Sequence, residues 1–191
     1  MTLSLLVARG GLLAAALEFR RQIFEKEQGT PGWDDFDDRA GHLVACEAGN
    51  VVAAARIVGP GQRPFSLEQY FDLAIHLPTA ADVGEIGRYC VREDWRGISK
   101  ATLLHLGMMK LAVSYAKNQR LRGLICSVQP NLQSFYRRMH FHPIGQAFDH
   151  PFFGHTTVMW LDIESLGISA STGGHPLNSL LDDPRIPPVI L

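Results

Sequence analysis

The chain has 191 residues, a formal net charge of −1, 46% hydrophobic residues and 19% charged residues. These values indicate one soluble globular domain, and they exclude the strong overall charge that a nucleic-acid or membrane-surface partner would require. No apolar stretch approaches the roughly 20 residues of a membrane span. Three cysteines lie far apart without a metal or redox spacing, which predicts buried, reduced thiols in a cytoplasmic protein.

The N-terminal segment predicts a strand, a helix and an acidic loop. Residues 3–8 are apolar, a glycine pair follows, and the apolar residues of 12–26 recur on one side of a helix. The loop over 28–39 contains Trp33 and four aspartates, which repel one another unless cations or solvent neutralise them. These aspartates are Asp34, Asp35, Asp37 and Asp38.

A hairpin and an apolar loop follow. The short apolar runs 42–46 and 51–58 are joined by a turn that contains Gly-Asn, and Arg56 lies inside the second run. Residues 65–77 are apolar without a regular period. Such a loop fits either a flap over the core or the wall of an apolar ligand site.

The chain is organised around residues 83–116. A strand is predicted over 83–91, where every second residue is apolar or aromatic, and a broad apolar stripe predicts a long helix after Gly97. The turn before this helix is an anion site, because the first N–H groups of a helix have no partner inside it. Glu85 and Arg88 lie beside the turn, which suggests group transfer from a phosphate-bearing carrier.

The last third of the chain predicts a strand over 124–128, a short helix over 132–139 and a hairpin whose second strand is 156–163. Ser, Gly and Pro dominate residues 167–191, which predicts an arm that is poorly ordered or laid on the surface. Together the elements predict an α/β (α+β) fold with a mixed sheet, in a single domain over residues 1–166.

Two segments resemble the GCN5-related N-acetyltransferase fold, a central mixed, twisted sheet flanked by helices. The family's central turn, Arg/Gln-x-x-Gly-x-Gly/Ala, falls on Arg96, Ser99 and Ala101, and its Tyr-x-x-x-Gly-Phe ending falls on Tyr136 and Phe141. The resemblance implies that the central turn holds the phosphopantetheine of an acyl donor. The implied donor-binding residues are Val91, Arg96, Gly97, Ile98, Ser99, Lys100 and Ala101.

A more specific combination of residues resembles the acyl-homoserine-lactone synthases, the long-chain N-acyl amino acid synthases and the ornithine-lipid N-acyltransferases. This resemblance runs in order over residues 12–163, through FRRQIFEKEQ, WDDFDDRAGHLVA and EIGRYCV. The shared residues are Arg20 or Arg21, Phe24, Trp33, Asp34, Asp37, Arg56, Glu85 and Arg88.

The resemblance implies an N-acyltransferase that moves a long-chain fatty acyl group to the amine of an amino acid or a related small molecule. The implied donor is acyl-carrier protein; its acylated phosphopantetheine, or acyl-CoA in its place, is a co-substrate, and no tightly bound cofactor is expected. Four arginines fit either the acidic surface of a carrier protein or ordinary solvated positions. They are Arg92, Arg96, Arg137 and Arg138.

Acyl transfer needs a neutral amine, a polarised thioester carbonyl and a proton for the departing thiolate. Glu85 is the candidate base, although it also fits a plain ion pair with Arg88 or Arg56. The resemblance makes Tyr136 the general acid, with a core tyrosine as the alternative. The implied acceptor-binding residues are Trp33, Asp34, Asp37, Arg56 and Arg88.

The two loop aspartates of this set are expected to be tethered by nearby arginines, which would order Trp33 over the acceptor. The arginines in question are Arg20, Arg21, Arg56 and Arg88. Behind the central strand we expect an apolar channel for the fatty chain, because each buried CH₂ contributes ~0.8 kcal/mol. Its expected lining, which would equally form a packed core, is Phe71, Leu104, Met108 and Phe135.

Three other functions stay open: an acyl-homoserine-lactone (autoinducer) synthase, an acyl-CoA-dependent N-acetyltransferase without a long channel, and a non-catalytic ligand-binding relative. Ser99 and His140 stand where the motifs of the fold have glycine, which keeps the last of these open. No metal site is expected, because the clustered histidines lack a ligand spacing. These histidines are His140, His142, His150 and His155.

Overall fold

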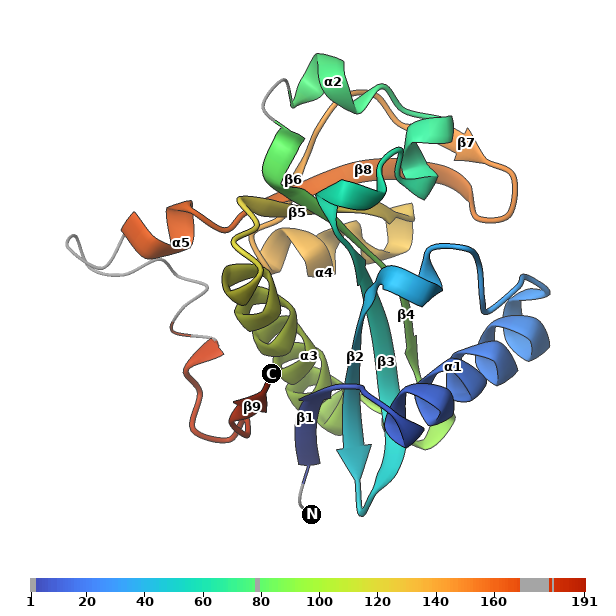
Figure 1. The fold of residues 1–191 in the computed structure, drawn as a ribbon, viewed down its shortest axis with the longest axis vertical. Coiled ribbons are helices and arrows are strands. Elements are labelled where there is room, and N and C mark those ends of the chain that lie inside the picture. The colour runs from blue at the N-terminus through green and yellow to red at the C-terminus, as the bar shows by residue number, and fades with distance from the viewer. Residues whose placement is uncertain (1–2, 78–79, 169–178, 180) are drawn as a thin grey trace.

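A twisted mixed sheet with helices on both faces forms the body of the molecule (Figure 1). The computed structural model describes residues 3–77, 80–168, 179 and 181–191. The described strands follow the order β6-β8-β5-β4-β3-β2-β1-β9, with β7 beside β8, and only β4–β5 and β1–β9 pair in parallel. The predicted α/β fold with a mixed sheet is therefore confirmed. The strands are β1 (Leu3–Val7), β2 (Gly41–Glu47), β3 (Asn50–Val58), β4 (Val83–Val91), β5 (Gly123–Val128), β6 (His142–Pro143), β7 (Phe148–His150), β8 (Gly154–Asp162) and β9 (Val189–Ile190).

Helices α1 and α3 cover opposite faces of the sheet (Figure 1). None of the helices in the described ranges is long and apolar enough to cross a membrane. The α-helices are α1 (Gly11–Ile23), α2 (Leu73–His76), α3 (Ile98–Asn118), α4 (Gln133–Arg138) and α5 (Ser165–Ile168). A π-helical turn, η1 (Phe24–Gln28), continues α1, and the 3-10 turns are η2 (Asp37–Arg39), η3 (Pro60–Gln62), η4 (Ser66–Gln69), η5 (Ala80–Asp82), η6 (Glu93–Trp95) and η7 (Pro130–Leu132).

The central strands are buried on both faces, which explains their nearly continuous apolar runs. Side chains alternate between the two faces along a strand. Leu43 and Ala45 of β2 belong to the core under α3, whereas Val44 and Cys46 pack with Ala16 under α1. All three cysteines are buried and unpaired, as predicted.

The predicted hairpin between β2 and β3 is confirmed. The two strands pair antiparallel, and their turn consists of Ala48 and Gly49. Both turn residues have positive φ angles, 48° and 81°, which is the pattern of a type I′ turn. The turn pairs Glu47 with Asn50, and a bulge between Ala45 and Cys46 then shifts the register by one residue, so that Arg56 lies opposite His42.

The described end of the C-terminal arm, residues 181–191, has most of its residues at least partly exposed and is anchored to the body of the molecule. Leu181 and Ile186 are buried in the core cluster under α3, and β9 pairs with β1 at the edge of the sheet (Figure 1). Burial of such apolar side chains stabilises a fold by about 1.5–3 kcal/mol each, which offsets the cost of ordering the arm. Residues 169–178 and 180 of the arm lie outside the described part.

Strands β4 and β5 pair only over the first three residues of each, from Val83 opposite Gly123 to Glu85 opposite Ile125. Strand β4 then continues to Val91 without β5 as its neighbour. The two strands therefore part just after Glu85, and the sheet opens there. The candidate site lies at this opening.

Candidate active site

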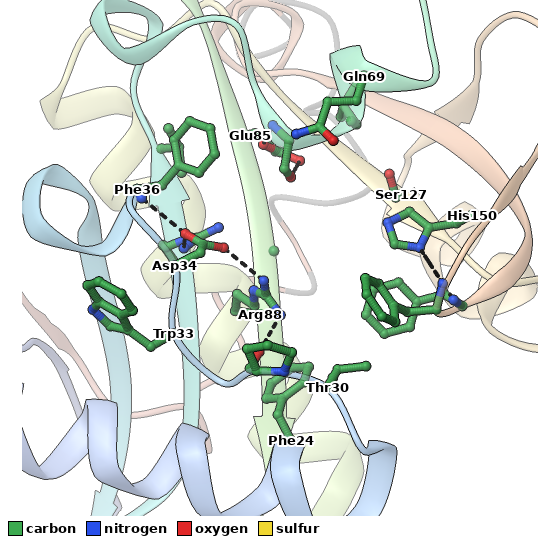
Figure 2. Close-up of a pocket in the computed structure, with 18 of the residues that line it drawn as sticks. Phe24, Thr30, Trp33, Asp34, Phe36, Gln69, Glu85, Arg88, Ser127 and His150 are labelled. Carbon is green, nitrogen blue, oxygen red and sulfur yellow. Dashed lines mark hydrogen bonds and ion pairs between the residues drawn. The ribbon is translucent and has the colours of Figure 1, made fainter.

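A bulge in β4 brings Glu85 and Arg88 to the same face of the sheet. Residues three apart in a regular strand point to opposite faces. Between two successive ladder pairs, however, β4 advances three residues while β3 advances two, so β4 carries one extra residue. Arg88 is in the left-handed region with φ 54°. Both side chains consequently line one cleft, which we call the polar cleft (Figure 2).

The polar cleft has a volume of about 440 Å³ and lies on the α1 side of the central strands. Charged and hydroxyl-bearing residues share its walls with aromatic rings (Figure 2). Trp33, expected over the acceptor, lies in this wall with 48% of its surface exposed. Residues that line the cleft include Thr30, Trp33, Asp34, Phe36, Arg56, Ser66, Tyr70, Glu85, Gly87, Arg88, Ser127 and His150.

The expected tethering of the loop aspartates is confirmed. Asp34 forms ion pairs with Arg56 and with Arg88, the second at 2.8 Å. Asp37 pairs with Arg20 at 2.7 Å and with Arg56 at 3.1 Å. Arg56 therefore joins both carboxylates, and three separate elements, α1, β3 and β4, hold the loop in place.

Arg20, and not Arg21, is the helix residue of this network. Arg20 is fully buried and also donates to the backbone oxygen of Gly32 at 2.7 Å. A Cβ on Gly32 would lie 2.4 Å from the Cα of Arg21, so only glycine lets the loop approach the helix this closely. The side chain of Arg21 pairs with Glu18 and Glu25 on the exposed side of α1.

The arginines keep both aspartates ionised. Burial alone would raise the pKa of Asp34, but the hydrogen bonds and charges of Arg56 and Arg88 outweigh it and lower the pKa to about 2. The same balance, with Arg20 as the main partner, lowers the pKa of Asp37. These two carboxylates are therefore structural anions at neutral pH and unsuited to act as proton acceptors.

Glu85 is in the opposite situation. It is buried, and no ion pair involves it among the described residues, so the alternative of a plain ion pair with Arg88 or Arg56 is excluded. Its carboxylate accepts hydrogen bonds from the hydroxyl and the backbone N–H of Ser66. Burial raises the pKa of Glu85 despite these bonds. A carboxylate with raised proton affinity in a cleft has the properties of a general base.

A second, smaller space lies on the α3 side of β4, and we call it the apolar cavity. Its volume is about 40 Å³, against about 440 Å³ for the polar cleft. Tyr136 lies in its wall, and burial raises the pKa of this phenol, which therefore stays protonated. The lining residues are Ala55, Ile86, Gly87, Tyr89, His105, Met108, Met109, Phe135 and Tyr136.

The two spaces meet at β4, because Ile86 and Gly87 line both of them. Nothing lies within 4 Å of the position where a Cβ on Gly87 would be, so there is open space beside this residue. Ile86 and Gly87 are thus the part of β4 that the two spaces share. Glu85 precedes the junction directly.

The four residues expected along a fatty chain are not brought together. Met108 and Phe135 line the apolar cavity. Leu104 is fully buried in the main core, and Phe71 packs in a separate cluster with Phe65 and Leu73, so neither lines the cavity.

The turn that is predicted to bind the donor lies between β4 and α3. Gly97 is the N-cap of α3, and the first helical bond runs from Ala101 N to Gly97 O at 2.9 Å. The helix begins at Ile98 and therefore includes the backbone of Ser99 and Lys100. The guanidinium of Arg96 donates to Val91 O at 2.8 Å and pairs with Glu27, so this side chain braces the end of β4.

Sequence reasoning did not find several polar residues of the two spaces. Ser66, Ser127 and His150 line the polar cleft, and Tyr89 hydrogen-bonds His105 in the apolar cavity. Nothing in the sequence pattern assigned these residues to a substrate site; His150 was considered only as one of the clustered histidines for a metal. Within the described ranges, no group of three or more His, Cys, Asp or Glu side chains could hold a metal ion.

Comparison with known proteins assigns the family. The family model described as "N-acyl amino acid synthase FeeM" matches residues 15–162. No curated protein sequence matches the chain significantly. FeeM itself, an N-acyl amino acid synthase from uncultured soil microbes, has a TM-score of 0.71 at 13% identity, over 85% of this chain and 91% of that chain.

Two further solved structures share the fold. BjaI, a CoA-dependent acyl-homoserine lactone synthase, has a TM-score of 0.73 at 18% identity, over 100% of this chain and 93% of its own. An acyl-CoA N-acyltransferase from Pseudomonas aeruginosa has a TM-score of 0.63 at 21% identity, over 84% of this chain and 99% of its own.

The sheet that parts beside β4, together with these likenesses, defines the fold of the GCN5-related N-acyltransferases. The match to the family model extends over most of the chain, and the protein accordingly belongs to the family of the N-acyl amino acid synthase FeeM. It is an N-acyltransferase.

Proposed function

We propose that the protein transfers a fatty acyl group from acyl-carrier protein to the amine of an amino acid or a close relative. The observation that carries this proposal is the junction at Ile86 and Gly87, where a charged cleft meets an apolar cavity. A polar amine and an apolar acyl group would thus reach β4 from opposite faces. Membership of the FeeM family supports the same reaction class.

The proposed chemistry assigns one proton transfer to each space. The amine nitrogen attacks the thioester carbon at the junction, and the C–S bond breaks as the C–N bond forms. Glu85 takes a proton from the ammonium group of the acceptor, directly or through a water molecule, which gives the neutral amine that attacks. Tyr136, which is protonated and lies in the apolar cavity, gives a proton to the departing thiolate. The second proton that the nitrogen loses on forming the amide replaces, overall, the one that Tyr136 gives up.

The acceptor is proposed to be a zwitterion. Asp34 and Glu85 supply negative charge to the polar cleft, and Arg56 and Arg88 supply positive charge, which suits a molecule with an amine and a carboxylate. The hydroxyl of Thr30 and the Nε of Arg56 are buried without a hydrogen-bond partner in the described structure. A bound acceptor that satisfied these atoms would gain their full hydrogen-bond energy. Trp33, Asp34, Asp37, Arg56 and Arg88 are accordingly proposed to bind or shape the acceptor site.

The donor's phosphopantetheine is proposed to pass the turn before α3, along Val91 and Arg96–Ala101. Of the four arginines considered for carrier binding, Arg92 pairs with Asp94 and Glu47, and Arg96 pairs with Glu27. Arg137 and Arg138 are exposed at the end of α4, where no acidic partner is found among the described residues. These two are the better candidates for contact with an acidic carrier protein. The three free, buried thiols favour a reducing compartment, and we place the reaction in the cytoplasm.

A long acyl chain would enlarge the apolar cavity. Met108 and Met109 lie side by side in its wall, and methionine side chains adapt to irregular spaces more readily than branched ones. Phe135 completes the proposed lining from α4. Leu104 is proposed to support the chain only from the packed core behind these residues, and Phe71, which packs in the separate cluster, has no place in this lining.

Product analysis with defined donors tests this function. Purified protein is incubated with acyl-carrier protein or CoA carrying the same acyl chain, together with a panel of amino acids, ornithine and S-adenosylmethionine. Mass spectrometry should detect a linear N-acyl amino acid, formed faster from the carrier-protein donor. A lactone formed from S-adenosylmethionine would identify an acyl-homoserine-lactone synthase instead. Turnover with acetyl-CoA alone would identify an acetyltransferase, and absence of any product would overturn catalysis.

The proposal that the substrates meet at Ile86 and Gly87 can be tested by replacing glycines of β4 with residues that carry a side chain. Gly87→Leu should reduce kcat/KM by about a hundredfold or more, because its side chain would occupy the open space where donor and acceptor meet and a small misplacement of reactants is costly. The melting temperature should change little, since the new Cβ has no atom within 4 Å. Steady-state kinetics and a thermal melt check both expectations.

Gly84→Ala is the matched control on the same strand. Its Cβ would lie 2.8 Å from Leu121 Cδ1 and 3.2 Å from Ile57 Cγ2, away from the junction. We expect this variant to lose about 1–3 kcal/mol of stability from overpacking while the folded fraction keeps its activity. Full activity of the Gly87→Leu variant would show that the substrates do not meet at this position.

A further inference from the structure

The turn η4 delivers two hydrogen-bond donors of one residue to the two oxygens of Glu85. The hydroxyl of Ser66 donates to Glu85 Oε1 at 2.7 Å, and the backbone N–H of Ser66 donates to Oε2 at 3.0 Å. A carboxylate that is held at both oxygens cannot rotate about its terminal bond. The face of Glu85 that is presented to the polar cleft is therefore fixed by Ser66.

Ser66 is itself held rigidly. Its neighbours Phe65 and Leu67 are 1% and 2% exposed and belong to the same buried cluster. Glu68 accepts the backbone N–H of Phe65 at 2.7 Å, and Arg63 holds Glu68 by a pair of hydrogen bonds. The turn is thus anchored on both sides of Ser66, and its hydroxyl stays at the carboxylate.

Among the groups around Glu85, Ser66 has the largest lowering effect on its pKa. Burial raises the pKa of Glu85, and the hydrogen bonds from Ser66 are the largest of the effects that lower it, ahead of the charge of Arg56. A hydrogen bond is stronger to a carboxylate than to a neutral acid, so the hydroxyl favours the ionised base. The titratable and charged groups nearest to this site on neighbouring elements are Arg56 on β3, Arg88 on β4, Cys126 on β5, His150 on β7, and Asp34 and Tyr70 in loops.

We propose that Ser66 is the positioning residue that keeps the buried Glu85 ionised and aimed at the acceptor amine. This inference rests on the proposed function of Glu85 as the base, and it adds a residue to which no role has been assigned. Ser66 need not touch either substrate to act in this way. It acts through the carboxylate alone.

The pH profile of three serine variants tests the proposal. Ser66→Ala removes the hydroxyl bond but keeps the backbone bond, so the pKa of Glu85 should rise and the acidic limb of kcat/KM should move to higher pH. On that limb activity should fall about tenfold or more, and at higher pH it should return towards the wild-type value. Ser66→Thr keeps a hydroxyl and should restore the wild-type limb. Ser127→Ala, which removes another hydroxyl from the same cleft, should leave the limb where it is.

Each outcome separates the inference from the function on which it rests. A loss in Ser66→Ala that is uniform at all pH values, or an unshifted limb, would overturn the role of Ser66. If the Glu85→Gln variant is inactive in that case, the assignment of Glu85 as the general base still holds. A fully active Glu85→Gln variant would contradict both the assignment of Glu85 as the base and the positioning role of Ser66. Thermal melts of the serine variants show whether a loss of activity reflects unfolding, and Ser66→Thr keeps the test valid if the alanine variant is unstable.

Discussion

Replacing Glu85 by glutamine is expected to reduce kcat by about 10²–10⁴-fold, the usual contribution of a positioned general base. The amide has nearly the same shape as the carboxylate but cannot take a proton from the attacking amine. Its oxygen can accept the backbone N–H of Ser66 while its NH₂ group donates to the Ser66 hydroxyl, so the fold should survive. Rates measured with saturating donor and acceptor, together with a thermal melt, check this expectation.

A second carboxylate of the same cleft provides the comparison. Asp35 lines the polar cleft, is exposed, and forms no ion pair or hydrogen bond with another described residue. Asp35→Asn removes the same charge without removing a buried base, so its effect on kcat should be at most a few-fold. If both variants lose activity equally, cleft charge rather than proton transfer explains the effect. An active Glu85→Gln enzyme would contradict the assignment of the base.

The spacing of Glu85 and Arg88 illustrates what a pattern along the chain can and cannot predict. The alternation over residues 83–91 correctly predicted a strand with the bounds of β4. A regular strand would place the two residues on opposite faces, and only the bulge at Arg88 turns both into the polar cleft. Arg88 has no sequence feature that marks a positive φ, because glycine, asparagine and aspartate are the residues that favour it.

Helix periodicity, by contrast, distinguishes Arg20 from Arg21 as the partner of the loop aspartates. Ala16, Arg20 and Phe24 are four residues apart and all buried, so they form one stripe of the helical segment, while Arg21 lies beside it. An arginine on the apolar stripe must find a buried partner, and that requirement selects Arg20.

Apolar composition alone could not separate a channel from a core. Leu104 and Met108 belong to the same helix and are both buried, yet only Met108 lines the apolar cavity. The same limit applies to the C-terminal arm. Its composition is rich in Ser, Gly and Pro and does not indicate that Leu181 and Ile186 are buried in the main core. Whether such residues are buried in a core or line a cavity depends on contacts with residues that are distant in the sequence. Local periodicity does not reveal these contacts.

Asp37→Ala is expected to cause the largest loss of stability among these variants. It removes the partner of Arg20, whose side chain is fully buried, and one of the two partners of Arg56. Breaking a buried ion pair on one side costs about 3–5 kcal/mol, because the remaining charge stays desolvated. For a chain of this length the melting temperature should fall by roughly 6–20 °C. Asp38→Ala, at the exposed neighbouring position, should change the unfolding free energy by no more than about 0.5 kcal/mol.

The pH dependence of this loss identifies its cause. Folding lowers the pKa of Asp37, and it lowers that of Asp34 from 3.8 to about 2, so both carboxylates stabilise the native state above the unfolded pKa. This stabilisation is lost as the pH falls through the lowered, native-state values. The stability difference between wild type and Asp37→Ala, measured by urea unfolding, should therefore be constant near neutral pH and shrink as the pH falls below about 4. A difference that persists unchanged into acid would mean that Asp37 stabilises the fold by packing and not by its charge.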